Sequence, residues 1–144
     1  MQLLIVYGPN LNLLGWVSRN TGTRLTLDKL NRELRRRSRE LGSELKIFQY
    51  QSESQASKLI QRQRNQVDGL VLVPGIWAAA GHLIRETVVI TRLPLAVFHL
   101  EPVNGPWNYQ KDSLFRDIAV LEEPGASPED LTAFLERFVT RLTS

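Results

Sequence analysis

Short apolar runs alternate with longer segments of helical periodicity along the whole chain, and this alternation restricts the fold more than any other feature. The runs at 2–7 and 69–73 are almost wholly apolar, which is typical of strands buried on both faces of a parallel sheet. The segments between such runs carry apolar residues at helical spacing. We expect strands at 2–7, 45–50, 69–73, 95–99 and 118–121, and helices at 26–41, 53–66, 78–91 and 128–142.

Strands that alternate with helices of this length form β–α–β units, whose crossovers are right-handed. The chain should therefore fold as an α/β protein, a doubly wound parallel sheet of about five strands with helices on both faces, in three layers. Ligands of such sheets bind beyond the carboxyl ends of the strands. This rule selects the loops after Tyr7, Tyr50, Val73 and His99 as the places where a site is expected.

The composition excludes several classes of site. The chain has 144 residues, no cysteine and two histidines, so thiolate chemistry, disulfides and histidine-rich metal sites are not expected. No apolar run approaches the roughly 18 residues of a membrane span, and the N-terminus lacks the pattern of a secretory signal. We therefore expect one domain over residues 1–144, in the cytoplasm, with no bound metal and no membrane partner.

Arginines gather in the first expected helix of a chain whose net charge is +3: Arg32, Arg35, Arg36, Arg37 and Arg39. Clustered arginine neutralises phosphates, so a nucleic-acid patch is one interpretation. The other is a solvated helix face with charge pairs such as Glu33–Arg37 and Arg36–Glu40. We favour the second and expect no nucleic-acid partner, because no aromatic residue or glycine interleaves with the arginines.

The first loop, Gly8-Pro9-Asn10-Leu11-Asn12-Leu13-Leu14-Gly15, lies where the topology places ligands. Glycine and proline predict a tight turn after the strand, and Asn10 or Asn12 could hold a polar ligand or a water there. The chain contains neither phosphate-binding glycine pattern, so no cofactor is expected. The polar stretch at 16–24 has the composition of a mobile lid.

The sequence GPNLNLLG after an N-terminal strand resembles the type II 3-dehydroquinate dehydratase family. Further matches occur at the family's spacing along nearly the whole chain: Thr26-Leu27, Gln49, Ser52, Glu53, Pro74-Gly75, Arg85-Glu86, His99-Leu100, Ser113 and Asp117. The resemblance implies a flavodoxin-like fold and a homo-oligomer built from trimers, up to a dodecamer. It also implies that Arg85 and Glu86 lie at a subunit boundary.

The chain departs from the family at most positions of the site. The family removes a proton beside a ketone with a lid tyrosine that an arginine activates; these positions hold Gly22 and Val17, and a one-residue slip would bring Arg19 near the arginine's place. Glycine has no side chain that could act as a base. Further family positions that hold the substrate or the catalytic groups are occupied by Val73, Ala79, Val97, Glu101 and Pro102.

Two polar side chains of the family's site remain, Asn10 and His99. In the family the asparagine holds a water that stabilises the enolate, and the histidine protonates the departing hydroxyl. The family's glutamate partner of this histidine corresponds to Val97. Glu101 could replace that partner, because residues i and i+2 share a face if the strand continues. The alternative is that His99 is a half-buried residue retained for packing.

Aromatic residues occupy the segments that would line the pocket: Trp16, Trp77, Phe98, Trp107 and Tyr109. Together with Val73, Ala79 and Leu100, they would suit a flatter and less charged small molecule. The alternative is that these aromatic side chains pack the lid shut or fill a subunit interface.

The sequence leaves three hypotheses of function open. The first, which we favour from the sequence, is a lyase, dehydratase or isomerase that acts on a more apolar or aromatic small molecule, with His99 as acid/base and Asn10 polarising a carbonyl. The second is a non-catalytic binding or assembly protein. The third is a divergent but active enzyme that converts 3-dehydroquinate to 3-dehydroshikimate with a base from elsewhere, such as Tyr109. We expect little or no turnover of 3-dehydroquinate, because the lid base and the carboxylate grip are both missing.

Overall fold

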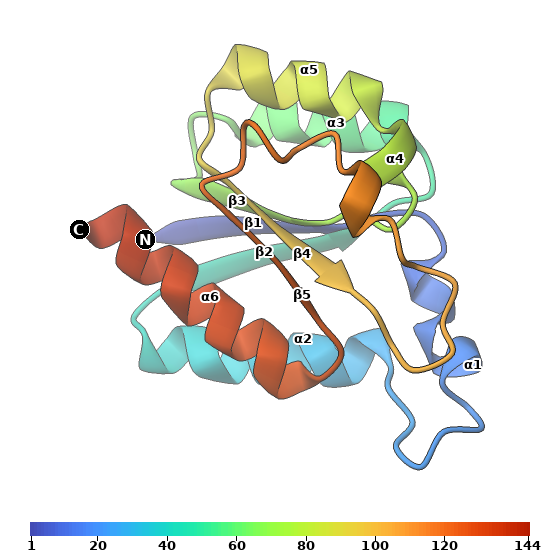
Figure 1. The fold of residues 1–144 in the computed structure, drawn as a ribbon. Coiled ribbons are helices and arrows are strands. Elements are labelled where there is room, and N and C mark those ends of the chain that lie inside the picture. Colours follow the sequence, from blue (N-terminus) through green and yellow to red (C-terminus); the bar gives the residue numbers. More distant parts are fainter.

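The computed structural model describes residues 1–144 and contains one sheet of five parallel strands (Figure 1). The strand order is β2-β1-β3-β4-β5, as in a doubly wound sheet. The α/β, flavodoxin-like fold expected from the sequence is confirmed. The strands are β1 (Gln2–Tyr7), β2 (Glu44–Gln49), β3 (Gly69–Val73), β4 (Leu95–Leu100) and β5 (Leu121–Gly125).

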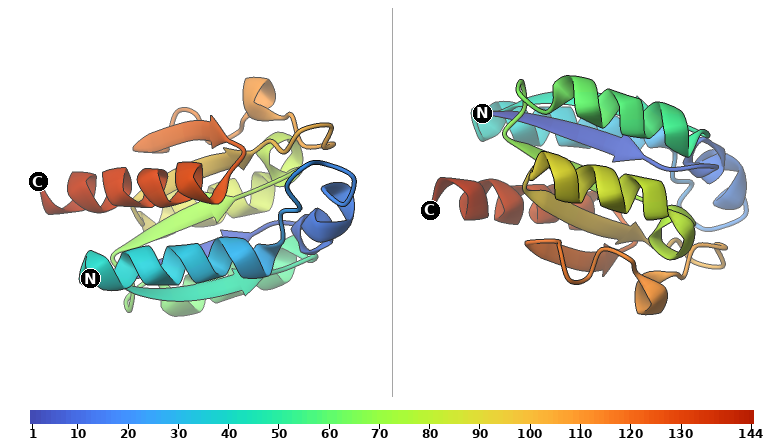
Figure 2. Two further views of the ribbon diagram at one scale, coloured as in Figure 1. Left: turned by 90° about the horizontal axis from the view of Figure 1, so that it is seen from below. Right: turned by 90° about the horizontal axis from the view of Figure 1, so that it is seen from above.

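Helices cover both faces of the sheet (Figure 2). Helices α2 (Leu27–Glu40) and α6 (Pro128–Thr143) pack together on one face, and α3 (Glu53–Gln63) and α5 (His82–Thr91) pack together on the other. The short helices α1 (Leu14–Val17) and α4 (Trp77–Ala80) follow β1 and β3, with single 3-10 turns at Leu11–Leu13 and Gln110–Asp112. None of the helices is both long enough and apolar enough to cross a membrane.

Side-chain caps start the long helices where the sequence predicts. The Thr26 hydroxyl accepts a hydrogen bond from the Lys29 N–H at 3.2 Å, and Ser127 and Asp130 form a capping box at the start of α6. Gly42, which follows the C-cap residue Leu41 of α2, has a φ of 70°, a left-handed conformation that favours glycine. Local sequence signals therefore fix the ends of these helices.

Most elements differ from the sequence prediction by one to three residues at an end, and two differ in a way that bears on the fold. The helix expected at 78–91 is divided into α4 and α5 at Gly81, which packs so closely that a Cβ would lie 2.6 Å from the Trp77 carbonyl oxygen. The last strand covers 121–125 rather than 118–121. This strand lies at the edge of the sheet and carries two glutamates, Glu122 and Glu123, that have partners outside the strand. It therefore lacks the continuous apolar run by which strands such as β1 and β3 are predicted.

The two faces of the sheet bury separate hydrophobic cores. The core under α2 and α6 includes Leu3 and Phe98, and the core under α3 and α5 includes Leu4 and Val97. Successive side chains of a strand point to opposite faces. His99 therefore lies on the same face as Val97, toward α5.

The arginine cluster of α2 takes part in ion pairs. Arg36 pairs with Glu33 at 2.5 Å, and Arg37 pairs with both Glu40 and Glu136 at 2.6 Å. The two pairs within the helix have i,i+3 spacing, so the expected Glu33–Arg37 and Arg36–Glu40 pairs are wrong in detail. The bond to Glu136 also connects α2 with α6, as expected of a structural rather than a nucleic-acid-binding role for Arg37.

The ends of β1 and β3 meet at Gly8, and this contact should be sensitive to substitution. The Gly8 N–H donates to the Val73 carbonyl oxygen at 2.8 Å, and a Cβ on Gly8 would lie 2.1 Å from the Pro74 carbonyl oxygen. Gly8→Ala should therefore lower the free energy of unfolding, measured with urea, by about 1–3 kcal/mol. Gly22→Ala is the matched control, because no atom lies within 4 Å of a Cβ there. Equal losses in both variants would contradict this account of the packing.

Candidate active site

His99 is buried at the carboxyl end of β4, where its side chain is 4% exposed. Its Nε2 lies 2.6 Å from Oε2 of Glu122, on the neighbouring strand β5. The parallel register places Glu122 directly beside Val97, two residues before His99. The histidine therefore has a carboxylate partner, although position 97 does not supply it.

Glu101, the partner expected from the sequence, is not the carboxylate that binds His99. Strand β4 ends at Leu100, so the alternation of side chains does not continue to Glu101. Instead the Glu101 backbone N–H donates to the Gly125 carbonyl oxygen at 2.8 Å. The expectation for Glu101 is thus corrected in favour of Glu122.

Ser113 joins this group from the segment between β4 and β5. Its hydroxyl donates to Glu122 Oε2 at 2.5 Å, and its oxygen accepts from the Phe115 N–H at 3.2 Å. The segment is anchored beside α4, where the Leu114 N–H donates to the Ala78 carbonyl oxygen at 2.8 Å. His99, Glu122 and Ser113 therefore form one hydrogen-bonded group on the α5 side of the sheet.

Arg85 of α5 holds the same segment in place. Its guanidinium donates to the Leu114 carbonyl oxygen at 2.7 Å and to the two carboxylate oxygens of Asp117 at 2.7 and 3.0 Å. These bonds hold the pKa of the Asp117 carboxyl below its usual range. Glu86 is exposed. Arg85 is thus bound within its own chain, and the place of Arg85 and Glu86 at a subunit boundary stays a prediction.

The pKa of the Glu122 carboxyl reflects opposing effects. Burial raises it, whereas the hydrogen bonds from His99 and Ser113, with the nearby charge of Arg116, lower it by more. The net pKa lies below the ordinary value of 4.5. Glu122 is therefore ionised at neutral pH and can accept hydrogen bonds from both neighbours.

The space beside His99 is small. Gly75, Leu100, Trp107 and Tyr109 line it and leave a cavity of about 10 Å³, close to the volume that one water requires. Trp107 is itself buried in the core. Of the residues expected to bind substrate, Leu100 and Tyr109 thus lie beside His99, and a larger ligand would require the segment at 101–112 to move.

Asn10 is not among the residues that line this cavity. Its N–H donates to Gln51 Oε1 at 2.6 Å, and its Oδ1 accepts from Gln51 Nε2 at 2.9 Å. Gln51 is held in turn by Gln49, which also donates to the Gly8 carbonyl oxygen at 3.0 Å. The structure therefore does not bring Asn10 and His99 together in one pocket, because the Asn10 amide is bound to Gln51.

Several residues expected to line the pocket are packed inside the protein instead. Val73 and Trp77 are buried in the two cores, and Ala79 is half-buried in α4. The three tryptophans therefore differ in their surroundings: the side chains of Trp77 and Trp107 are packed inside the protein, whereas Trp16 is 65% exposed. This arrangement favours packing over a wide aromatic pocket.

The residues expected to form a lid lie in separate places. Asn12 and Trp16 line a surface cavity of about 400 Å³, and the Arg19 guanidinium stacks on the Trp16 ring with its central carbon 3.7 Å from the ring centroid. Val17 packs against the core under α2 and α6. Gly22 lines a second cavity of about 640 Å³ between residues 18–25, the segment after β4 and the start of α6.

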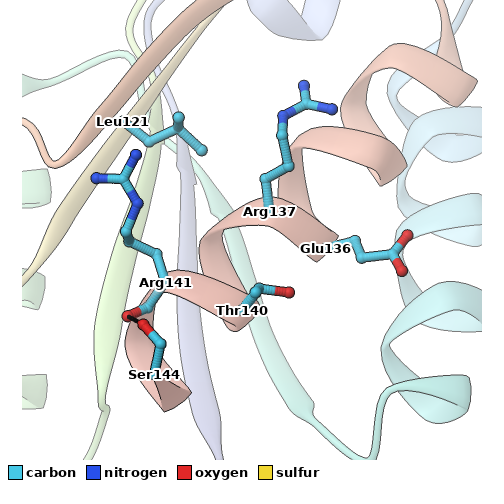
Figure 3. A pocket seen from close by; sticks show the side chains of 6 residues that line it. All are labelled: Leu121, Glu136, Arg137, Thr140, Arg141 and Ser144. Carbon is cyan, nitrogen blue, oxygen red and sulfur yellow. Dashed lines mark hydrogen bonds between the residues drawn. The ribbon is translucent and has the colours of Figure 1, made fainter.

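A further cavity lies beside α6 and the first residue of β5 (Figure 3). It measures about 450 Å³, and its two arginines already have partners: Arg137 donates to Glu123, and Arg141 donates to the Val120 carbonyl oxygen. No group of three His, Cys, Asp or Glu side chains is arranged to hold a metal ion. The group around His99 is thus the arrangement best suited to proton transfer.

Sequence reasoning missed Glu122 because it placed the fifth strand three residues too early. A signal was present in Glu122-Glu123-Pro124-Gly125, where Pro124 is typical of an edge strand. With the strand at 121–125, the register of a parallel pair brings Glu122 to Val97.

Glu122 should make part of the stability of the protein depend on pH. A carboxyl whose pKa is lower in the folded chain stabilises the fold above its unfolded pKa, and this contribution is lost as the pH falls below 4.5 toward the folded pKa. Between about pH 7 and about pH 3, the unfolding free energy of Glu122→Gln should therefore fall less than that of the wild type. Glu101→Gln should follow the wild type. If the unfolding free energy of Glu122→Gln fell toward acid pH as much as that of the wild type, the hydrogen bonds described for Glu122 would be refuted.

Nearly the whole chain is similar to one family. Residues 1–136 match the family described as Dehydroquinase class II. The chain is 32% identical to 3-dehydroquinate dehydratase of Thermotoga neapolitana over 82% of this chain and 80% of that protein. It is also 32% identical to 3-dehydroquinate dehydratase 1 of Pseudomonas aeruginosa, over 82% and 81%. Its fold matches the crystal structure of type II dehydroquinase from Butyrivibrio crossotus with a TM-score of 0.84, at 20% identity over 96% of this chain and 97% of that one. With the fold and the GPNLNLLG loop in agreement, the chain belongs to the class II dehydroquinase family.

Proposed function

We propose that this protein is a lyase of the 3-dehydroquinate dehydratase type, in which residues 1–144 form one domain and His99 is the proton donor. The observation that carries the proposal is the buried group of His99, Glu122 and Ser113 at the carboxyl end of the sheet. The named relatives favour the third hypothesis from the sequence. Their names give no support to the more apolar substrate that the sequence led us to prefer.

Dehydration of a hydroxy ketone of this kind needs two proton transfers. A base removes the proton beside the ketone, which gives an enolate, and an acid protonates the hydroxyl that leaves as water. A protonated His99 would supply the second proton and return to the neutral imidazole. Glu122 would hold the ring and stabilise its positive charge before the transfer.

The base would come from outside the lid, because Gly22 has no functional group. Tyr109 is the phenol that lines the cavity beside His99. Tyr7 does not suit this role, because it is fully buried and burial raises the pKa of its phenol above the ordinary range. Movement of the segment at 101–112 would open the site and expose Tyr109 and His99 to the same ligand.

A second candidate function is binding or assembly without catalysis. Two observations favour it: the cavity beside His99 measures about 10 Å³, and the family's lid base and its arginine correspond to Gly22 and Val17. In that case the His99 group would stabilise the edge of the sheet and would take no part in a reaction.

We also propose that the chain forms a homo-oligomer built from trimers, up to a dodecamer, in the cytoplasm. Helix α5 supports an interface, because apolar side chains are exposed along it: Leu83, Val89 and Ile90. Ile90 is 71% exposed, and exposed apolar patches on a helix are typical of contact surfaces.

A direct assay tests the proposed function. The wild type should dehydrate 3-dehydroquinate, which is followed by the ultraviolet absorbance of the conjugated ketone formed. His99→Gln should lower kcat by about 10²–10⁴-fold, the usual contribution of an acid/base group. The glutamine keeps an amide N–H that can donate to Glu122, so the variant should stay folded by circular dichroism. A folded wild type without turnover would reject the lyase and favour the second candidate.

Light scattering tests the assembly. We expect the mass of a trimer, or of an assembly of trimers, of the 16.4 kDa chain. Ile90→Glu should shift this mass toward smaller species, because a charge would then be buried in the interface. Val103→Glu is a matched control, since Val103 is similarly exposed at 68% but lies outside α5. A stable wild-type monomer of 16.4 kDa would rule out the proposed oligomer.

A further inference from the structure

Two positions of the paired strands β4 and β5 can present a carboxylate to His99. The first is position 97 on the same strand, which holds glutamate in the family that the chain resembles and valine in this chain. The second is position 122, because Val97 and Glu122 are direct partners in the parallel ladder. Paired residues of neighbouring strands lie about 4.8 Å apart and point to the same face. A carboxylate can therefore move from one position to the other and still reach the same ring.

We propose that Glu122 is the positioning residue of His99 and replaces, across the β4–β5 ladder, the carboxylate that is absent at Val97. We further infer that His99 exchanges its proton through Nδ1. The bond between Glu122 and His99 stands on geometry alone, and only the proton exchange with a substrate rests on the proposed function.

The hydrogen bonds decide which nitrogen of the ring carries a proton. The Phe115 N–H donates to Ser113 Oγ at 3.2 Å, which directs the hydroxyl hydrogen of Ser113 toward Glu122 Oε2, 2.5 Å away. The same Oε2 lies 2.6 Å from His99 Nε2. An ionised carboxylate has no hydrogen to donate. Nε2 therefore carries the hydrogen of this bond and donates it to Glu122.

Nδ1 is then the nitrogen that remains for chemistry, since the hydrogen bond that the ring makes is through Nε2. In the protonated ring, Nδ1–H would donate its proton to the hydroxyl oxygen of the substrate. The carbon–oxygen bond breaks, water leaves, and the ring becomes neutral. The Nε2–H bond to Glu122 persists throughout, so the ring keeps one orientation in both protonation states.

The burial of Glu122 argues against a role in packing alone. Its side chain is 12% exposed, and a buried carboxylate destabilises a fold unless donors compensate it. An apolar residue would fill this position at lower cost, as Val97 does beside it. The carboxylate is therefore a specific feature of this site, held by the donors His99 and Ser113.

NMR of ¹⁵N-labelled protein at neutral pH tests the positioning. The wild type should show a His99 Nε2–H resonance that is shifted downfield and exchanges slowly with water. Glu122→Gln keeps the shape but removes the charge, and it should speed this exchange about tenfold or more. Glu101→Gln should leave the resonance unchanged. A wild type without the resonance, or a Glu122→Gln variant that retains it unaltered, overturns the proposal.

Moving the carboxylate tests the replacement itself. Glu122→Val should lose the slowly exchanging resonance, and Val97→Glu combined with Glu122→Val should regain it. Thermal unfolding shows whether each variant is folded. A folded double variant without the resonance contradicts the replacement across the ladder, and the Glu122→Gln comparison decides the positioning if the double variant does not fold.

Activity of the same variants separates this proposal from the proposed function. With 3-dehydroquinate, Glu122→Gln should lower kcat about tenfold to a hundredfold with little change in KM, and a folded double variant should recover part of the loss. A wild type with the NMR signature but no turnover rejects the lyase and supports the positioning. Turnover that is equal in the wild type and Glu122→Gln overturns the role of Glu122 in the reaction.

Discussion

Parallel pairing of the strands determines where the chemical groups of this protein lie. Because β1, β3 and β4 run in the same direction, the loops that follow them all lie at the carboxyl ends of the strands. Gly8 permits the close approach of β1 and β3 at these carboxyl ends, where the Gly8 N–H donates to the Val73 carbonyl oxygen. The same pairing sets Glu122 beside Val97 and within reach of His99. The neighbouring Glu123 points to the opposite face, where it binds Arg137 of α6.

The parts of the fold that could be predicted are those whose signals are local. The ranges expected for β1 and β3 agree with the structure at both ends, because strands buried on two faces are continuous apolar runs. Strand β5 could not be placed by this signal, since the sheet edge lets it carry Glu122 and Glu123. The division of the helix at Gly81 depends on contact with Trp77, for which the helical periodicity gives no sign.

His99 lies at the carboxyl end of β4, as the sequence predicted for the candidate site, but the residues that bind His99 could not be predicted. The register of β4 and β5 brings Glu122 to His99, and their hydrogen bond joins residues 23 positions apart. Asn10 is turned by a φ of 67° and bound by Gln51, 41 residues away. Directions of loop side chains depend on such distant contacts, which composition and periodicity do not contain. The family resemblance identified Gly22, Val17 and Val97 as positions where the family's functional side chains are missing. The structure shows that Glu122, beside Val97, binds His99.

The protein thus combines His99, the proton donor that we propose, with a small cavity and with a segment at 16–24 that lacks the family's base. These features are compatible with the proposed catalysis if the segment at 101–112 moves to admit the substrate to His99. A crystal structure with 3-dehydroquinate bound tests this most directly. We predict that the ligand lies against Nδ1 of His99 with the segment displaced and with Glu122 still bound to Nε2. A ligand bound away from His99, or a Glu122 turned away from the ring, would contradict this account.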